Sequence, residues 1–206
     1  MFKNKYLSTR QKIYMPFKRF FAIFFSLLAI LLIGWLLLII AIIIKCTSKG
    51  PIIFKQERIG KNTNHFFIYK FRTMRIDTPN NIPTHMLDNP DMYITKIGKF
   101  LRKTSLDELP QLFNILKGEM YFVGPRPALY NQDDLVAERE KYHANDIAPG
   151  MTGLAQVSGR DELPIPIKAK YDGEYFKKFN IWFDIKMCLL TVVAVFSHKG
   201  VKEGKN

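Results

Sequence analysis

Two adjacent acids, Asp107 and Glu108, lie in the part of this sequence that is richest in chemically useful side chains, residues 102–114. Adjacent carboxylates with arginines nearby can bind Mg²⁺ on a diphosphate, and one of them can act as a nucleophile. A structural role fits the same residues, because Ser105 and Glu108 match a capping box and acids stabilise a helix N-terminus. Spacing alone favours capping, so a catalytic role needs support from neighbouring residues.

Basic side chains on either side of the acidic pair give that support. Arg102 lies five residues before Asp107. Arg126 stands between Pro125 and Pro127, whose rings fix φ, so this arginine is held on a stiff loop that suits bidentate phosphate binding. On the motif alone, an arginine in a Pro-rich surface turn is an equally good interpretation. The sequence has no glycine-rich P-loop, so bound phosphates would be held by Arg, Lys and a metal ion.

The elements that would position these side chains can be predicted from apolar spacing and turn residues. Apolar residues recur at helical spacing in residues 93–103 and 109–117, so a short helix is expected on each side of residues 104–108. Residues 51–56 and 65–71 are rich in Ile, Phe and Tyr and flank a turn, which predicts a β-hairpin. Other predicted elements are a loop at residues 77–92 and helices at residues 133–143, 165–179 and 181–196.

An apolar segment, residues 20–44, precedes all of these elements. Of its 25 residues, 23 are apolar and none is charged, which predicts a membrane anchor. The segment is longer than the apolar core of a cleaved signal peptide and ends at Lys45, so we expect it to be retained. The last predicted helix is too short to span a bilayer, and packing in the core is favoured for it over a position in the membrane interface.

The net charge of +13 is concentrated on both sides of the apolar segment. Residues 1–19 carry six basic side chains and no acid, residues 45–76 carry eight against one acid, and residues 77–206 are neutral overall. Basic residues beside a membrane segment favour anionic lipids on the cytoplasmic side. A nucleic-acid binder would carry its surplus charge on the soluble domain, so no nucleic-acid partner is predicted. The two cysteines, Cys46 and Cys188, form no close pair, which agrees with a reducing cytosol.

The charge pattern also favours an anchor that enters the membrane and returns. A straight helix over residues 20–44 would reach about 37 Å, enough to cross a hydrocarbon core of about 30 Å. Crossing would leave one of the two basic flanks outside, against the positive-inside rule. Gly34, near the middle, is the residue where such a helix could break and return. We therefore expect a re-entrant anchor, with a single span as the alternative.

Five stretches of the sequence, in the same order, resemble the bacterial sugar transferases, which are monotopic phosphoglycosyl transferases. They are FKQERIG from Phe54, YKFRTM from Tyr69, KTSLDELPQLFNILKGEM from Lys103, VGPRP from Val123 and PGMTGLAQVSGR from Pro149. The resemblance implies transfer of a sugar phosphate from a UDP-sugar to a polyprenol phosphate such as undecaprenyl phosphate. Release of UMP would accompany this first step of capsule, exopolysaccharide or glycoprotein glycan assembly.

The resemblance also implies roles for individual residues. The family's catalytic dyad falls on Asp107 and Glu108, with Asp107 as covalent nucleophile and Mg²⁺ bound at the dyad. Substrate-binding positions around the nucleotide and phosphates fall on Arg72, Arg102, Pro125, Arg126, Pro127 and Arg160. The anchor departs from the family pattern, since Gly34-Trp35 stands where many members have Ser-Pro and Ala22 stands where an Asp is usual.

Together these observations predict an α+β protein. Residues 1–45 would form a basic tail and a membrane-embedded, re-entrant helix, and residues 46–206 a compact, mostly helical catalytic domain with a short β-hairpin on the cytoplasmic face. Residues 75–80 and 127–135 look most like capsule-forming relatives that use a UDP-linked acetamido sugar. The alternative is a non-catalytic membrane scaffold of a polysaccharide-assembly complex, which loss of the dyad or of the GPRP motif would favour. No oligomeric state is predicted.

Overall fold

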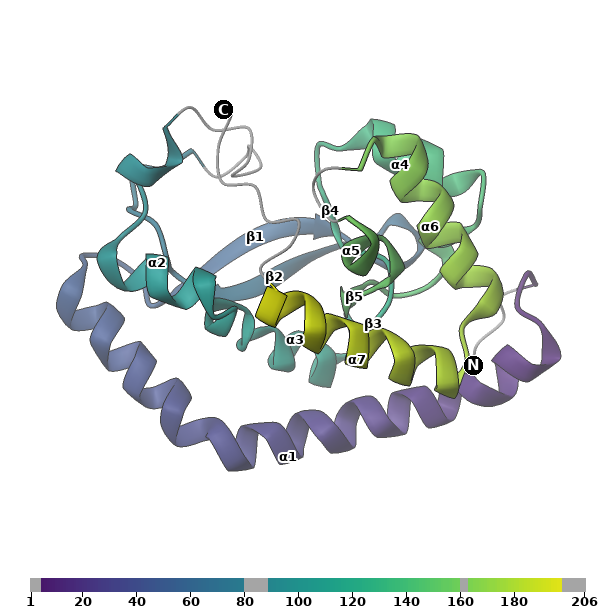
Figure 1. Cartoon of the computed structure of the whole chain (residues 1–206), viewed down its shortest axis with the longest axis horizontal. Helices are drawn as coiled ribbons and strands as arrows, with labels where there is room; N and C mark the ends of the chain where they lie inside the picture. The colour runs from purple at the N-terminus through teal and green to yellow at the C-terminus, as the bar shows by residue number, and fades with distance from the viewer. Residues whose placement is uncertain (1–4, 80–88, 160–162, 198–206) are drawn as a thin grey trace.

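A long N-terminal helix lies along one side of the molecule in the computed structural model, which describes residues 5–79, 89–159 and 163–197 (Figure 1). This helix, α1, covers Thr9–Thr47 and includes Pro16, so it begins well before the predicted apolar segment. A capping box fixes its start, because Ser8 Oγ accepts a hydrogen bond from Gln11 N and Gln11 Oε1 accepts one from Ser8 N. Much of the basic N-terminal region is therefore helical.

Both ends of α1 pack against the same domain. Met15 belongs to the main hydrophobic cluster, and Ile44 belongs to a second cluster near the other end of the helix. Between them one face of the helix packs inward, as the buried Ala22 shows, but many apolar side chains point outward, and Leu31 is 80% exposed. Figure 1 shows α1 bowed, with the rest of the molecule on its concave side. The helix is continuous through Gly34, so the break expected at this residue is absent.

The exposed middle of α1 is suited to lipid. Among the described residues, α1 is the one helix long and apolar enough to cross a membrane, and only 11% of its apolar window is buried inside the protein. A surface of this size and apolarity is poorly suited to water. The predicted N-terminal membrane helix is thus confirmed as a structural element.

The predicted hairpin is present and forms most of a three-stranded sheet. Strands β1 (Ile53–Ile59) and β2 (His65–Phe71) pair antiparallel over their whole length. Strand β4 (Ala128–Leu129) adds to the free edge of β1, which gives the order β2-β1-β4. A separate parallel pair joins β3 (Tyr121–Val123) to β5 (Gly150–Thr152). The sequence did not predict β3, β4 or β5, because each is too short to show a periodic pattern.

Six α-helices follow α1 in the described residues. They are α2 (Lys96–Lys103), α3 (Gln111–Lys117), α4 (Asp133–Glu140), α5 (Leu154–Ser158), α6 (Ile165–Lys178) and α7 (Ile181–Ser197). All except α5 match predicted helices, and the α+β class is confirmed. Residues 80–88 of the predicted loop lie outside the described residues.

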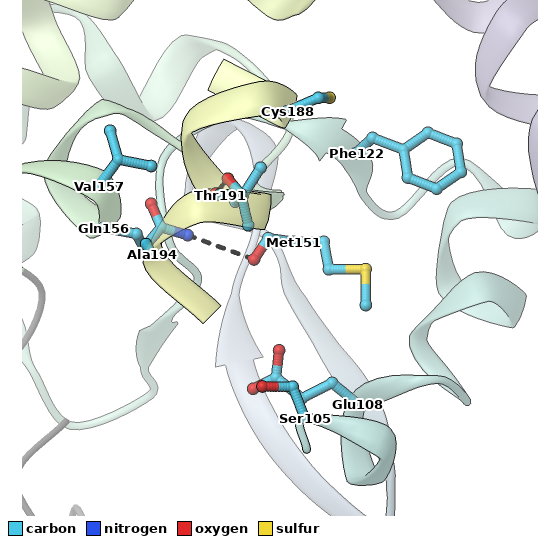
Figure 2. Close-up of a pocket in the computed structure, with 10 residues that line it drawn as sticks. Ser105, Glu108, Phe122, Met151, Gln156, Val157, Cys188, Thr191 and Ala194 are labelled. Carbon is cyan, nitrogen blue, oxygen red and sulfur yellow. Dashed lines mark hydrogen bonds between the residues drawn. The ribbon is translucent and has the colours of Figure 1, made fainter. Parts of the chain in front are cut away.

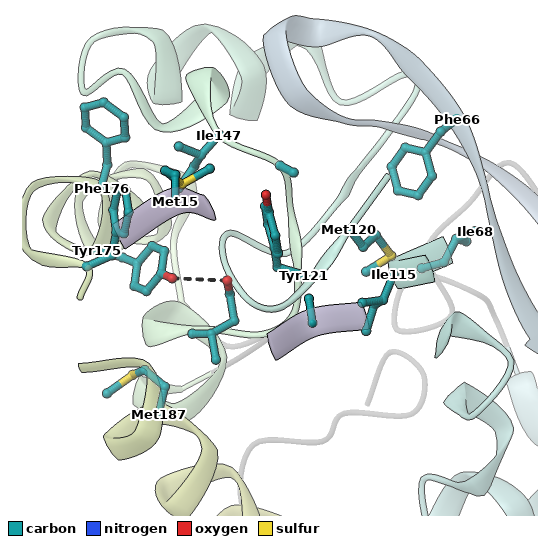
Figure 3. Close-up of a cluster of buried hydrophobic side chains, with 14 of the residues drawn as sticks. Met15, Phe66, Ile68, Ile115, Met120, Tyr121, Ile147, Tyr175, Phe176 and Met187 are labelled. Carbon is teal, nitrogen blue, oxygen red and sulfur yellow. Dashed lines mark hydrogen bonds between the residues drawn. The ribbon is translucent and has the colours of Figure 1, made fainter. Parts of the chain in front are cut away.

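The main core joins the hairpin, the helices and α1. Figure 3 shows Phe66 and Ile68 of the hairpin and Ile115 of α3 on one side, with Tyr175 and Phe176 of α6 on the other. Segments of α1 pass between these groups. The domain that follows α1 is therefore packed directly against this helix.

Helix α7 has one buried face and one exposed apolar face. Met187 is 1% exposed and belongs to the main core, but Trp182 and Leu189 are 77% and 64% exposed. The expectation of core packing is therefore correct for one face and wrong for the other. In Figure 1, α7 lies close to α1 and roughly along it.

A buried polar cluster fastens α1 to α7 and to β3. Lys18 Nζ donates to Asp184 Oδ2 at 2.7 Å and to the carbonyl oxygen of Val123 at 2.8 Å. Tyr175 donates to Asp184 Oδ1 at 2.6 Å, so the carboxylate is held by more than one donor. Because Val123 directly precedes Gly124 of the GPRP motif, the anchor helix is bonded to the base of that loop.

Candidate active site

The acidic pair lies on a tight turn between α2 and α3. Leu106–Glu108 form one turn of 3₁₀-helix, entered through Ser105 in a left-handed conformation with φ 56°. Ser105 makes no side-chain capping bond, and α3 begins only at Gln111, with Pro110 as its N-cap residue. The capping box expected from the spacing is therefore wrong, because positive φ at Ser105 and a separate short turn replace a regular helix start.

The two carboxylates have different surroundings. Asp107 is buried, with 8% of its surface exposed, whereas Glu108 Oε1 accepts a 2.8 Å hydrogen bond from Lys70 Nζ on β2. Burial raises the pKa of Asp107 to about 6; the charge of Lys70 opposes this rise, Glu108 adds to it and Arg102 opposes it. Asp107 is therefore ionised at neutral pH but more basic than an exposed aspartate, which suits a nucleophilic carboxylate.

Arg102 and Arg72, both predicted to bind substrate, occupy different environments. Arg102 is in the last turn of α2, and its positive charge lowers the pKa of Asp107, so the structure brings it near the dyad. Arg72 is buried and donates to Ser48 O at 2.8 Å and to Ser48 Oγ at 2.7 Å. This contact fastens the C-terminal end of α1 to the end of β2. Substrate contact by Arg72 stays a prediction that these bonds do not support.

The GPRP loop is held by its own backbone. Gly124 N donates to Thr152 O, and Gly150 N donates to Pro125 O, each at 2.8 Å. The carbonyl oxygen of Pro127 accepts from Arg58 Nη1 at 3.1 Å. Pro125 and Pro127 are buried, and the Arg126 side chain between them is half-buried. These bonds agree with the expected stiffness of the loop, and phosphate binding by Arg126 stays a prediction.

Arg160, the remaining predicted substrate-binding residue, lies outside the described residues. Within the described part of the chain, no group of three or more His, Cys, Asp or Glu side chains could hold a metal ion. The dyad is therefore a pair of carboxylates rather than a complete protein cage for a cation.

A pocket of ≈ 240 Å³ lies beside Glu108 (Figure 2). Phe122 and Met151, from β3 and β5, and Val157 of α5 provide apolar walls, and α7 closes the opposite side. Gln156 lines the pocket as well and donates to the carbonyl oxygen of Met151 at 3.4 Å. Figure 2 shows Ser105 and Glu108 at one end of this space, so the dyad turn and the pocket adjoin.

Comparison with known proteins shows the family of the chain. The sequence model of the bacterial sugar transferases matches residues 13–198, which include all of α1 except its start and every later element through α7. The chain belongs to the bacterial sugar transferase family.

Relatives of this bacterial sugar transferase are named as sugar-phosphate transferases or as an exopolysaccharide production protein. It is 40% identical over 198 residues to the UDP-glucose:undecaprenyl-phosphate glucose-1-phosphate transferase of Klebsiella pneumoniae, covering 90% of this chain and 41% of that protein. It is 42% identical over 191 residues to the exopolysaccharide production protein PSS of Rhizobium leguminosarum bv. phaseoli, covering 86% of this chain and 94% of that protein.

A third relative carries a different sugar in its name. The UDP-N-acetylgalactosamine-undecaprenyl-phosphate N-acetylgalactosaminephosphotransferase of Aeromonas hydrophila is 36% identical over 196 residues, covering 92% of this chain and 46% of that protein. The chain thus spans less than half the length of the Klebsiella and Aeromonas relatives but nearly all of the Rhizobium protein.

Two residues of this sugar transferase were missed by sequence reasoning. Lys70 lies in one of the motifs but was given no role, although it pairs with Glu108. Gln156 lies in another motif and lines the pocket. The sequence shows Lys70 as a basic residue on a strand that precedes the dyad. Only the folded hairpin shows that this lysine pairs with Glu108.

Proposed function

We propose that this bacterial sugar transferase transfers a sugar phosphate from a UDP-sugar to undecaprenyl phosphate or a similar polyprenol phosphate, and so begins assembly of a capsule or exopolysaccharide. The observation that carries the proposal is the buried carboxylate of Asp107, ionised near neutral pH and placed beside Glu108, Lys70 and Arg102. Family membership and the printed names of the relatives support the same substrates.

The reaction proceeds in two displacements at the sugar-bearing phosphorus. An Asp107 carboxylate oxygen forms a bond to this phosphorus while the phosphoanhydride bond breaks, and UMP leaves with the bonding electrons. An oxygen of the polyprenol phosphate then attacks the same phosphorus, which breaks the acyl phosphate and restores the Asp107 carboxylate. The products are UMP and a polyprenol diphosphate sugar.

The positive charges around the dyad reduce repulsion between a carboxylate and a diphosphate. Arg102 and Lys70 both stabilise the ionised form of Asp107, and Arg126 on its rigid loop would bind a phosphate bidentately. Asp107 and Glu108 fit Mg²⁺, which proteins usually bind through one or two carboxylates together with substrate phosphates. When bound, Mg²⁺ would neutralise phosphate charge as UMP leaves. Glu108 would then exchange its bond to Lys70 for the cation.

The acidic pair would be held at the cytoplasmic membrane surface, where UDP-sugar and polyprenol phosphate can both reach it. The exposed apolar middle of α1 and the exposed face of α7 would lie in the lipid, and the basic residues flanking α1 would contact anionic headgroups. An acetamido sugar is the proposed sugar, since residues 75–80 and 127–135 resemble relatives that use one.

The decisive experiment compares wild type with Asp107→Asn in purified, membrane-reconstituted form, supplied with undecaprenyl phosphate and a panel of UDP-sugars. Wild type should release UMP, and a mass increase equal to sugar phosphate should appear on the peptide containing Asp107. Asp107→Asn should lose at least about tenfold in rate, about 1.4 kcal/mol in barrier height, and form no adduct. Asp133→Asn, an exposed acid on α4, is the matched control. Wild type without UMP release from any UDP-sugar would favour the non-catalytic scaffold.

A further inference from the structure

Asn114, on α3, has a buried side chain that is bonded to the backbone of β2. The residue is 0% exposed. Asn114 Oδ1 accepts a 3.0 Å hydrogen bond from Tyr69 N, and Asn114 Nδ2 donates a 2.7 Å bond to Phe67 O. A further 2.7 Å bond runs from Nδ2 to Glu119 Oε2. The amide therefore uses its oxygen and both of its hydrogens, and the backbone donor and acceptor that it faces fix its orientation.

The two backbone groups that Asn114 binds lie on the free edge of β2. Strand β1 occupies the opposite edge, since the sheet has the order β2-β1-β4. An edge strand carries N–H and C=O groups that have no partner strand. The amide of Asn114 takes the place of that strand, because it offers an acceptor to Tyr69 N and a donor to Phe67 O. Helix α3 is thereby fixed in register against β2.

The residues next to these bonds are those of the dyad turn and its lysine partner. Lys70 directly follows Tyr69 on β2, and Lys70 Nζ donates to Glu108 Oε1 at 2.8 Å. The dyad turn ends at Glu108 and α3 begins at Gln111, so the position of the turn depends on the position of α3. The register that Asn114 sets between α3 and β2 is therefore also the register between Glu108 and Lys70.

Other contacts of α3 constrain this register less. Ile68 of β2 and Ile115 of α3 belong to the main hydrophobic cluster, but burial of apolar surface is non-directional, whereas hydrogen bonds have strict distance and angle requirements. Arg19 donates to the last carbonyl groups of α3 and so ties the helix to α1. Lys117 Nζ bonds to Tyr69 Oη at the surface, between two side chains that can rearrange in water.

We propose that Asn114 is a positioning residue for the transfer reaction, which holds Lys70 at bonding distance from Glu108 and so places the Asp107 carboxylate for attack on phosphorus. The inference rests on the proposed function, because it concerns the same acidic pair. Asn114 acts through the backbone of β2 and through Lys70, not by contact with substrate. A misplacement of about 1 Å caused by a change away from the chemistry can slow a reaction by about 100-fold.

The test follows a single turnover without acceptor by the full-length protein in lipid nanodiscs, with UDP-glucose or UDP-N-acetylgalactosamine, whichever wild type uses faster. The amplitude of UMP release relative to wild type reports the active fraction, and the rate constant at saturating UDP-sugar reports the geometry of the dyad. Asn114→Ala removes all three side-chain bonds and should lower the rate constant at least about tenfold. Its amplitude and its affinity for UDP should stay within about twofold of wild type.

Two further variants and a control show whether Asn114 acts through Lys70. The double variant Asn114→Ala, Lys70→Met should have a rate constant within about twofold of the slower single variant, because both changes disturb the same contact. Asn114→Ser disturbs the packing less and should lower the rate constant in the same direction. Tyr69→Phe, which removes the surface bond to Lys117 between the same two elements, should leave rate constant and amplitude unchanged.

The outcomes separate this inference from the proposed function. A rate constant at the wild-type level in Asn114→Ala, with only the amplitude reduced, would overturn the inference and make Asn114 a residue of the fold alone. Loss of folding in both Asn114 variants would lead to the same conclusion. Additive effects of Asn114→Ala and Lys70→Met would also overturn it, because the two residues would then act independently. Absence of UMP release by folded wild type would instead overturn the proposed function.

Discussion

Lys70 on β2 and Glu108 on the dyad turn form a partly buried ion pair with 2.8 Å between Nζ and Oε1. The pair joins the hairpin to the turn between α2 and α3, so the position of the acidic residues depends on the sheet as well as on the helices. The same lysine lowers the pKa of Asp107 against the larger effect of burial. Lys70 is therefore both a positional and an electrostatic partner of the dyad.

Removing this charge should make Asp107 harder to ionise. In Lys70→Met the pKa of Asp107 should rise above its wild-type value of about 6. Burial and the charge of Glu108 raise this pKa, and of the two positive charges that lower it only Arg102 would remain. A nucleophilic carboxylate must be deprotonated, so the acidic limb of the profile of kcat/KM against pH should move to higher pH. UMP release measured across pH checks this. Lys55→Met, an exposed lysine on β1, should leave the profile in place.

The buried carboxylate of Asp107 should lower the stability of the folded protein at neutral pH. Its folded pKa of about 6 lies above the ordinary aspartate pKa of 3.8, so between about pH 4 and 6 the folded state retains a proton that the unfolded state has lost. Stability therefore falls as pH rises through this window, and the cost is complete above pH 6. Asp107→Asn escapes this cost and should be more stable than wild type at pH 7.5, by up to about 3 kcal/mol.

Thermal unfolding at pH 7.5 and near pH 4 measures this difference. The advantage of Asp107→Asn should shrink toward the acidic end, where the wild-type aspartate is protonated in the folded state and increasingly protonated in the unfolded state. Asp133→Asn, which changes an exposed acid, should show no such dependence. An advantage of Asp107→Asn that is equal at both pH values would contradict the assignment of a raised pKa to this residue.

The elements with long periodic patterns could be predicted from sequence, and the dyad turn could not. Pairing of Ile53–Ile59 with His65–Phe71 follows from two runs rich in Ile, Phe and Tyr on either side of a turn. Helices α2, α3, α6 and α7 follow from helical spacing. The turn at Ser105 was misread because its S-x-x-E spacing also fits a capping box. The positive φ of Ser105 distinguishes the observed turn from a capping box, and a tertiary contact such as that between Lys70 and Glu108 can hold the turn in place.

Burial was the other property that local sequence did not reveal. Helix α7 contains apolar residues on nearly every side, so its sequence cannot say that Met187 is buried while Trp182 is exposed. That difference is set by where α1 and the core lie. The burial of Gln156 is likewise a result of three-dimensional packing, since no helix was predicted for the stretch that contains this residue.

Arg126 should not tolerate a lysine. The backbone bonds of Gly124 and Gly150 fix the loop, so the loop backbone cannot shift to recover lost geometry. Lysine cannot form two parallel bonds to a phosphate. Arg126→Lys should lower kcat/KM for the UDP-sugar by more than about tenfold while the protein stays folded. Steady-state kinetics of UMP release check this, with Arg75→Lys, an exposed arginine paired with Asp77, as the control. Near-wild-type kinetics would show that Arg126 is a turn residue only.

The bond between Lys18 and Asp184 should stabilise the whole fold. Lys18→Met removes the buried cation and leaves the Asp184 carboxylate with only tyrosine donors. Breaking one partner of a buried ion pair costs about 3–5 kcal/mol. Thermal unfolding of the detergent-purified protein should show this loss, together with lower expression. Lys12→Met, exposed on the same helix, should be close to wild type, and a Lys18→Met protein with unchanged stability would show that the pair is not needed to hold α1.

The last prediction is that both ends of α1 face the cytoplasm. Its 39 residues would reach about 58 Å as a straight helix, yet Met15 and Ile44 both pack against the same domain. A helix spanning the bilayer could not keep both contacts, because the domain would have to lie on both sides of the membrane. The exposed middle around Leu31, by contrast, can dip into one leaflet while the ends stay bound to the domain.

Cysteine labelling in intact bacterial cells distinguishes these topologies. In a Cys188→Ala background, the native Cys46 reports on the C-terminal end of α1 and is exposed, and Lys5→Cys reports on the residues before the helix. A membrane-impermeant maleimide should label neither position in intact cells, because both positions face the cytoplasm. After permeabilisation the reagent should label position 5. A cysteine added in a periplasmic protein serves as the positive control for labelling of intact cells. Labelling of position 5 before permeabilisation would establish a single span with its N-terminus outside, and the contacts of Met15 with the core could then not form in the membrane.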